Sequence, residues 1–142
     1  MINFSVGTLT LCITPWERVV PLDNLSEPWV KSYVEYTLPG VKIQYTIELT
    51  IDEMMILRDA LQRFYDNIST QKTCSDINFS SMEKYFSLSF SQVENREIAE
   101  VNILMLPERH ADSVKVADTF YLDQSYFPII ISGLTEIINW EN

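Results

Sequence analysis

Hydrophobic and polar residues alternate along two blocks of the chain, and each block ends in a segment with helical spacing. Residues 2–13 alternate with a change of phase at Gly7, which predicts either a pair of strands or one bulged strand. Residues 29–38 and 41–49 show the period of two that is typical of half-buried strands. Three prolines between positions 15 and 28 predict a surface loop ahead of these strands.

The stretch after these strands predicts a first helix over residues 52–68. Thr50 and Glu53 match a capping box, in which the hydroxyl and the carboxylate each bond a free backbone amide at the helix start. Hydrophobic residues then recur at the spacing of a helix with one buried face. They are Met54, Leu57, Leu61, Phe64 and Ile68.

The second block repeats this arrangement after a polar loop over residues 69–81. Alternation returns over residues 84–91, 98–106 and 114–122, which predicts three strands. A final amphipathic helix is expected over residues 125–140. Its predicted buried residues are Phe127, Ile130, Ile131, Leu134, Ile137 and Ile138.

The resulting order is β-β-β-α-β-β-β-α, and most strand connections have hairpin length, which makes neighbouring strands antiparallel. We therefore expect an α+β two-layer sandwich, with one mostly antiparallel sheet of about six strands and both helices on one face. The length suits a single domain over residues 1–142. Gly133 lies inside the last helix, where glycine costs roughly 1 kcal/mol relative to alanine. It predicts a close approach of this helix to the sheet, and the packing of a partner's side chain at this position is the alternative.

The charge is strongly acidic, with 20 acidic and 10 basic side chains and a formal net charge of −10. The excess is spread over both halves of the chain rather than held in a tail. A field of this sign repels phosphate backbones and anionic lipid and attracts basic proteins. We therefore expect no direct binding of nucleic acid or membrane. Solubility alone is the alternative explanation of the charge.

The cysteines and the start of the chain bear on its location. Cys12 lies in an alternating strand and Cys74 in a polar loop, without the spacing of a disulfide framework or a metal site. The chain has no basic start followed by an apolar run and no apolar stretch of roughly 18 residues. These features predict a cytoplasmic protein with free thiols.

Catalytic residues are hard to find in this sequence. His110 is the only histidine and lies in a polar turn, so no zinc-ligand pair has the required spacing. Glu94, Glu97 and Glu100 lie near one predicted hairpin, but no apolar pocket is evident that would separate their pKa values for acid–base catalysis. We expect no enzymatic activity, no metal and no cofactor.

A charged and aromatic surface is the better candidate for function. Tyr33 and Glu35 share the strand face opposite Val34 and Tyr36, and exposed aromatics among charges are common at protein interfaces. Ordinary packing beneath the loop over residues 15–28 is the alternative. The candidate partner-binding residues are Tyr33, Glu35, Glu94, Glu97, Glu108 and Asp112.

Three segments carry a resemblance to a known family. They are Glu27-Pro28-Trp29-Val30 before a long strand, Leu49-Thr50-Ile51-Asp52-Glu53 at the start of the first helix, and Asp123-Gln124-Ser125-Tyr126-Phe127-Pro128 before the last. In these segments and in the order of its elements, nearly the whole chain resembles the WapI family of immunity proteins.

The resemblance implies a non-catalytic antitoxin that binds the toxic domain of a contact-dependent or secreted polymorphic toxin. Toxins of that kind are often nucleases, and an acidic protein suits their basic grooves. The implied partner is a cognate toxin domain. The acidic charge of this chain predicts a basic surface on that partner, and we expect this protein to be a monomer or weak homodimer. The alternative is an enzyme or small-molecule binder with a pocket between sheet and helices, using polar groups such as Tyr121, Asp123 and Tyr126.

Overall fold

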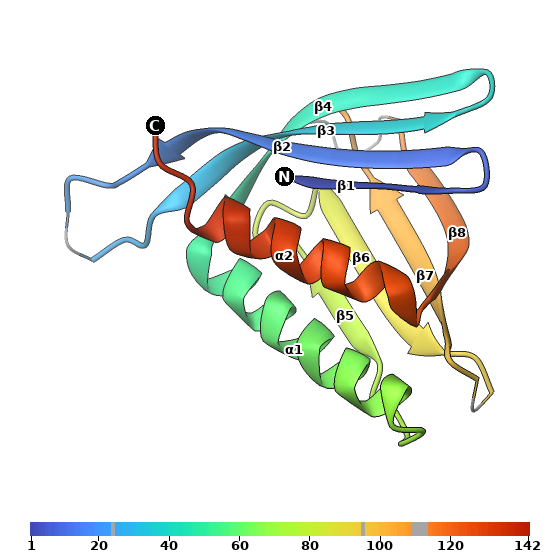
Figure 1. The fold of residues 1–142 in the computed structure, drawn as a ribbon. Coiled ribbons are helices and arrows are strands. Elements are labelled where there is room, and N and C mark those ends of the chain that lie inside the picture. Colours follow the sequence, from blue (N-terminus) through green and yellow to red (C-terminus); the bar gives the residue numbers. More distant parts are fainter. Residues whose placement is uncertain (24, 95, 109–113) are drawn as a thin grey trace.

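Eight antiparallel strands form two four-stranded sheets in the computed structural model, which describes residues 1–23, 25–94, 96–108 and 114–142 (Figure 1). In each sheet the strands are ordered as they follow in the chain. The first sheet contains β1 (Ile2–Val6), β2 (Leu9–Val19), β3 (Trp29–Leu38) and β4 (Val41–Thr50). The second sheet contains β5 (Ile77–Ser80), β6 (Phe86–Gln92), β7 (Ile98–Met105) and β8 (Val116–Asp123).

Two helices lie side by side next to the two sheets (Figure 1). The helix α1 (Ile51–Ser69) follows β4 directly, and a short 3-10 turn, η1 (Gln124–Tyr126), leads from β8 into α2 (Phe127–Ile138). The ring of Phe127 stacks on Phe64 of α1 with centroids 5.3 Å apart and lies 6.1 Å from the ring of Phe90 in β6. One aromatic side chain thus connects both helices to the second sheet.

The α+β class is confirmed, as is the broad order in which each of two blocks of strands is followed by a helix. Each block has four strands rather than three, and the expected single sheet of about six strands is wrong. Gly7, at φ 58°, makes the turn between two separate strands, which was one of the two alternatives for residues 2–13. The strand β5 lies in the segment expected to be a loop, and β2 continues to Val19 through Pro15. Each block of strands then pairs only within itself.

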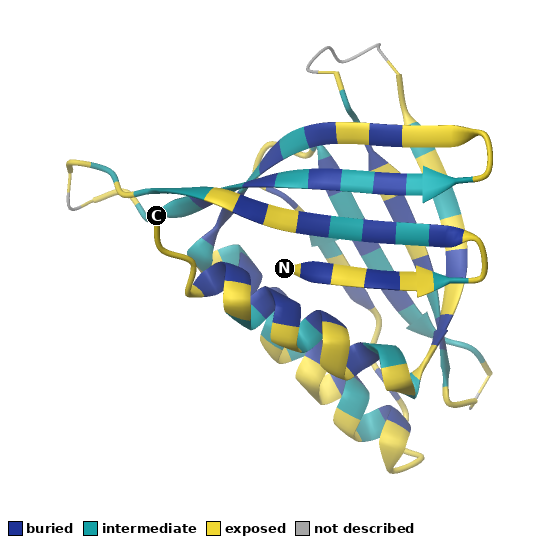
Figure 2. Ribbon diagram, turned by 45° about the horizontal axis from the view of Figure 1, so that its top comes forward, coloured by how far each residue is buried: buried dark blue, intermediate teal, exposed yellow. Residues whose placement is uncertain are grey.

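The core lies between the inner faces of the two sheets and the helices. Along each strand of the first sheet, buried residues alternate with more exposed ones (Figure 2). The rings of Phe4 and Phe120 lie 6.1 Å apart and join β1 to β8. The hydroxyl of Tyr36 donates a hydrogen bond to the carboxylate of Asp118, and so links β3 to β8.

The start of α1 and the start of η1, which leads into α2, are held by specific hydrogen bonds. The predicted capping box is present, with Thr50 accepting from the Glu53 amide at 3.3 Å and Glu53 accepting from the Thr50 amide at 2.9 Å. Asp123 accepts a hydrogen bond from the Ser125 amide at 2.9 Å and so starts η1.

In the described part of the chain, no helix combines the length and the apolar character that a membrane crossing requires.

Candidate protein-binding surface

The outer face of the first sheet carries two of the predicted contact residues. Tyr33 and Glu35 project from β3 away from the core and are half-buried among their cross-strand neighbours. Tyr33 lies between Thr14 and Thr46, and Glu35 lies opposite Gln44. The period of two in β3 places both residues on this face, as the sequence predicts.

A β-bulge in β2 adds a tryptophan to the same face. The register shifts between Pro15 and Glu17, so Trp16 is the extra residue of the bulge, and its side chain is 50% exposed. The Nζ atom of Lys31 lies 5.3 Å from the Trp16 ring centroid and 3.2 Å from Glu17 Oε2. This cation–π and ionic contact holds the tryptophan against the sheet while leaving half of it accessible.

The acidic candidates outside β3 do not lie on this face. Glu94, at φ 34°, and Glu97 belong to the β6–β7 connection, where Glu97 accepts a hydrogen bond from Gln124 Nε2 at 3.3 Å. Glu108 follows the opposite end of β7, across the length of the second sheet (Figure 1). The sixth candidate, Asp112, and His110 lie outside the described residues.

The β2–β3 connection has a feature that the sequence analysis missed. It projects beyond the rest of the molecule (Figures 1 and 2), and three of its described hydrophobic side chains are largely exposed. Val20 is 66% exposed, Leu22 105% and Leu25 97%. A run of aliphatic residues between prolines in a predicted surface loop was the available signal, because such a loop offers no core to bury them.

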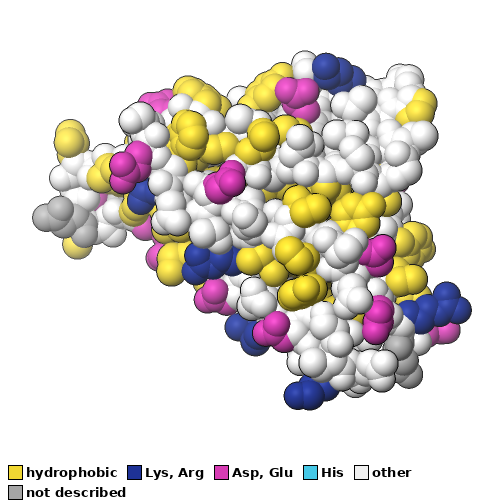
Figure 3. Space-filling model, viewed as in Figure 1, with side chains coloured by type: hydrophobic (Ala, Val, Ile, Leu, Met, Phe, Trp, Pro, Cys, Tyr) yellow, Lys and Arg dark blue, Asp and Glu magenta, His cyan; other side chains and the backbone are white. Residues whose placement is uncertain are grey.

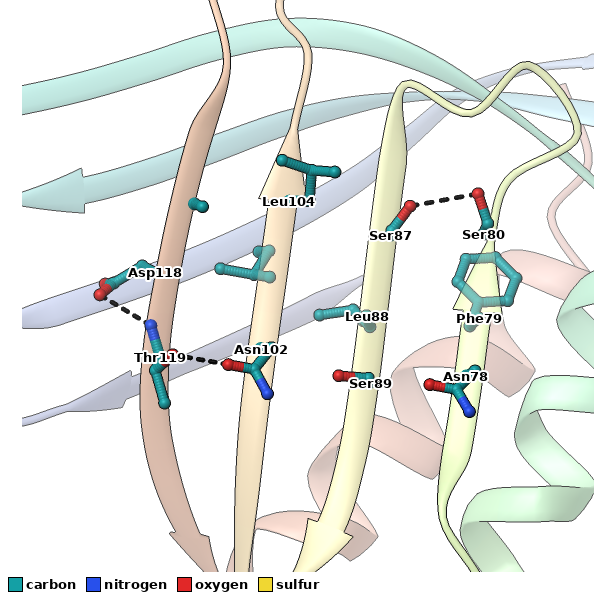
Figure 4. A pocket seen from close by; sticks show the side chains of 12 residues that line it. Asn78, Phe79, Ser80, Ser87, Leu88, Ser89, Asn102, Leu104, Asp118 and Thr119 are labelled. Carbon is teal, nitrogen blue, oxygen red and sulfur yellow. Dashed lines mark hydrogen bonds between the residues drawn. The ribbon is translucent and has the colours of Figure 1, made fainter.

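The outer face of the second sheet is hollowed, with a volume of about 730 Å³ (Figure 4). One straight row of small polar side chains crosses all four strands: Asn78, Ser89, Asn102 and Thr119. Thr119 Oγ1 donates to Asn102 Oδ1 at 2.6 Å, and the carboxylate of Asp118 accepts from the Thr119 amide at 2.8 Å. Thr119, Asn102 and Asp118 thus bond to one another, and among the described residues that line the hollow none places a nucleophile beside a histidine or lysine base.

The cavity between the two sheets and α2 is too small for a ligand. The cavity between the two sheets and α2, lined by apolar side chains, has a volume of about 20 Å³, which suits at most one water molecule. Of the residues considered for a pocket, Tyr121 is 55% exposed, Tyr126 donates to the carbonyl of Ser5 at 3.1 Å and Asp123 starts η1. They do not converge on a common space.

The buried titratable groups have structural partners. Burial raises the pKa of Glu53, while hydrogen bonds from the amides of Thr50 and Met82 oppose that rise. Burial also raises the pKa of the Cys74 thiol, which favours the unreactive protonated form. Among the residues that the structure describes, no three histidine, cysteine or acidic side chains group in a way that could hold a metal ion.

Comparison with solved structures identifies the architecture. The fold is similar to WHY3 from Arabidopsis thaliana, with a TM-score of 0.50 and 11% identity over 96% of this chain and 84% of that chain. It is also similar to the plant transcriptional regulator PBF-2, with a TM-score of 0.51 and 11% identity over 96% of this chain and 78% of that chain. At this identity the similarities show the fold alone.

Comparison at the level of sequence gives a family. No characterised protein sequence matches the chain. The model of the immunity protein WapI-like family, in contrast, matches residues 1–141. Because this match covers nearly the whole chain, the protein belongs to the immunity protein WapI-like family.

Proposed function

We propose that this protein is a non-catalytic immunity protein that binds and neutralises a cognate bacterial toxin domain in the cytoplasm. The family match over residues 1–141 is the observation that carries the proposal. The filled core supports it, because a protein that acts by occupying a partner's surface needs a preformed shape and no substrate pocket.

The charge supports a toxin with a basic surface. A protein of net charge −10 is steered toward a cationic partner, and this attraction speeds association and weakens as salt is added. A nuclease domain is a partner of this kind, because it holds a phosphate backbone with basic side chains. Occupying that groove with carboxylates would exclude the nucleic acid.

The outer face of the first sheet is the proposed docking face. It combines Trp16 and Tyr33 with Glu35, and aromatic side chains among charges are the usual centre of a protein interface. Glu94, Glu97 and Glu108 lie at the two ends of the second sheet. For these three we propose a contribution to the long-range field rather than direct contact.

The proposal predicts that a toxin domain is encoded beside this protein and is neutralised by it, and the lack of an adjacent toxin gene would contradict the proposal. Expression of that domain alone should stop growth, and co-expression of this protein should restore it. With purified proteins, inhibition of the toxin should be complete at one equivalent. Failure of rescue, or inhibition that continues after this protein is removed from the toxin, would contradict stoichiometric binding.

A further inference from the structure

The β2–β3 connection is held at both ends by the helices. On the β2 side, Arg18 Nη1 donates to the carbonyls of Ile138 and Trp140 at 2.8 and 3.3 Å. On the β3 side, the carbonyl of Pro28 accepts from the Ile51 amide at 3.2 Å, at the start of α1. The loop therefore leaves the body from two fixed points, the C-terminal end of α2 and the N-terminal end of α1.

Further bonds strengthen both attachments. The amide of Arg18 donates to Asn142 Oδ1 at 2.7 Å, and Asn142 Nδ2 donates to the Arg18 carbonyl at 3.0 Å. Glu27 Oε2 accepts from the Asp52 amide at 3.3 Å. An anion at a helix start and a cation at a helix end also complement the helix dipoles. The two ends of the loop, Arg18 on the β2 side and Glu27 and Pro28 on the β3 side, form its stem. This stem is thus held to the folded body by hydrogen bonds.

The tip of the loop is organised by its own side chain. Asp23 Oδ1 accepts hydrogen bonds from the amides of Leu25 and Ser26 at 3.3 and 2.8 Å. Hydrogen bonds from the Ser26 side chain and backbone lower the pKa of the Asp23 carboxyl. The turn therefore forms with its carboxylate charged and fully exposed.

We infer that the loop tip, defined as Val20, Leu22, Asp23 and Leu25, is a preformed plug that inserts into an apolar pocket with a basic rim on the toxin domain. This inference rests on the proposed function. Three strongly exposed aliphatic side chains on one projecting loop are costly to solubility and typical of an interaction site. Figure 3 shows hydrophobic side chains on this projection, at its left.

The charges of the loop select the partner. Between Val19 and Val30 the chain contains the acids Asp23 and Glu27 and no lysine or arginine. An apolar tip on a loop segment whose only charged side chains are acidic matches a pocket bordered by cationic groups. A second copy of this protein, with a net charge of −10, is a poorer match.

The anchored stem also explains why the tip can bind tightly. A flexible loop would lose conformational freedom on binding, and that loss reduces affinity. Here the helix ends and the Asp23 turn fix the conformation of the tip before it binds. Most of the binding free energy gained by burying the aliphatic side chains is therefore not lost to ordering the loop.

A double substitution tests the plug. Leu22→Gln with Leu25→Gln removes the apolar tip, and Ile129→Gln with Ile56→Gln is the matched control, because these exposed isoleucines lie on the helices. We expect the tip variant to bind the purified toxin domain about 30-fold more weakly or worse. The control should stay within about twofold of the wild type, and all variants should keep the wild-type unfolding midpoint.

A charge substitution tests the basic rim. Asp23→Asn keeps an oxygen acceptor for the Leu25 and Ser26 amides but removes the charge. We expect association to slow several-fold at low salt, and this difference to disappear at roughly 0.5 M salt.

The outcomes separate the two proposals. If the wild type does not bind the toxin domain, the proposed function fails and the plug fails with it. If the wild type binds and the tip variant binds equally well, only the plug is overturned. If the tip variant loses self-association in sedimentation without losing toxin affinity, the occupant is a second copy, and the plug is likewise overturned.

Discussion

Gly133 of α2 faces the backbone of Ile2 in β1 so closely that a side chain would not fit. A Cβ atom at position 133 would lie 2.6 Å from the Met1 carbonyl oxygen, 2.7 Å from Ile2 Cγ1 and 2.9 Å from Ile2 Cα. Two of these atoms belong to the backbone and cannot move aside cheaply. The predicted close approach of the last helix to a sheet is therefore confirmed, and its partner is the edge strand β1.

Gly133→Ala should destabilise the fold although alanine is the better helix former. The helix gains about 1 kcal/mol from the substitution, but relieving the overlap with Ile2 requires α2 to shift and should cost more, for a net loss of about 1 to 3 kcal/mol. Urea unfolding measures this difference. Ser132→Ala, at the exposed neighbouring position, is the control and should leave stability the same or slightly higher. An equally stable Gly133→Ala protein would contradict the close packing.

Tyr36→Phe should weaken the contact between the two sheets. The substitution removes the hydroxyl that donates to Asp118 and leaves this carboxylate with one partner fewer. A hydrogen bond to a charged group contributes about 1.5 to 3 kcal/mol, so a loss in that range is expected. Thermal or urea unfolding measures the change. Tyr33→Phe, on the outer face of the same strand, should change stability by less than about 0.5 kcal/mol.

Two of the seven tyrosines should resist ionisation in alkali. Burial raises the pKa of Tyr36, with Asp118 adding to the effect, and burial alone raises the pKa of Tyr45, both from an ordinary value of 10.0. Because the folded values exceed the unfolded one, the neutral phenols stabilise the fold fully below pH 10.0. This contribution is lost as the pH rises through the folded values.

Phenolate absorbance during an alkaline titration checks this expectation. The signal of all seven tyrosines should be complete only when circular dichroism reports unfolding, and Tyr36→Phe and Tyr45→Phe should each reduce the late step. Complete ionisation while the protein is still folded would show that these two side chains are accessible.

Glu53→Ala should cost more stability than a typical helix-cap substitution. Glu53 Oε1 accepts from the Thr50 amide at 2.9 Å, and its Oε2 accepts from the Met82 amide at 3.0 Å. One carboxylate thus closes the start of α1 and ties it to the segment before β6, and we expect a loss of about 2 to 3 kcal/mol. The exposed Asp52→Ala is the control, with an expected loss below about 1 kcal/mol. If urea unfolding shows the same loss of stability for Glu53→Ala and Asp52→Ala, the bond from Glu53 to the Met82 amide does not stabilise the fold.

Arg18→Ala should loosen the β2–β3 loop more than it unfolds the protein. The substitution removes the bonds to the carbonyls of Ile138 and Trp140, while the Asp23 turn and the Glu27 attachment stay intact. We expect amide hydrogen exchange between residues 19 and 26 to rise about tenfold, with global stability lower by about 1 kcal/mol. The exposed Arg63→Ala on α1 is the control. Unchanged exchange in the loop would mean that the α2 end does not hold it.

Local signals determined most of the elements. The capping box of Thr50 and Glu53 and the period of two in β3 depend on neighbours within a few residues, and both were predicted correctly. The stripe from Met54 to Ile68 is buried as expected. The position of Tyr33 and Glu35 on an outer face follows from the same alternation. These features depend only on residues that are close together in the sequence, so the sequence is sufficient to predict them.

The sequence by itself therefore determined most of the elements, most of their buried faces and the acidic charge. The tertiary structure alone decided that the strands divide into two sheets, that Tyr36 meets Asp118, and that Arg18 and Pro28 attach one loop to both helices. Periodicity states which side of a strand is buried but not which other segment covers it. Contacts between residues far apart in the chain depend on how all the elements pack together. The exposure of Leu22 and Leu25 likewise follows only from the packed structure, in which no other element covers them to any large extent.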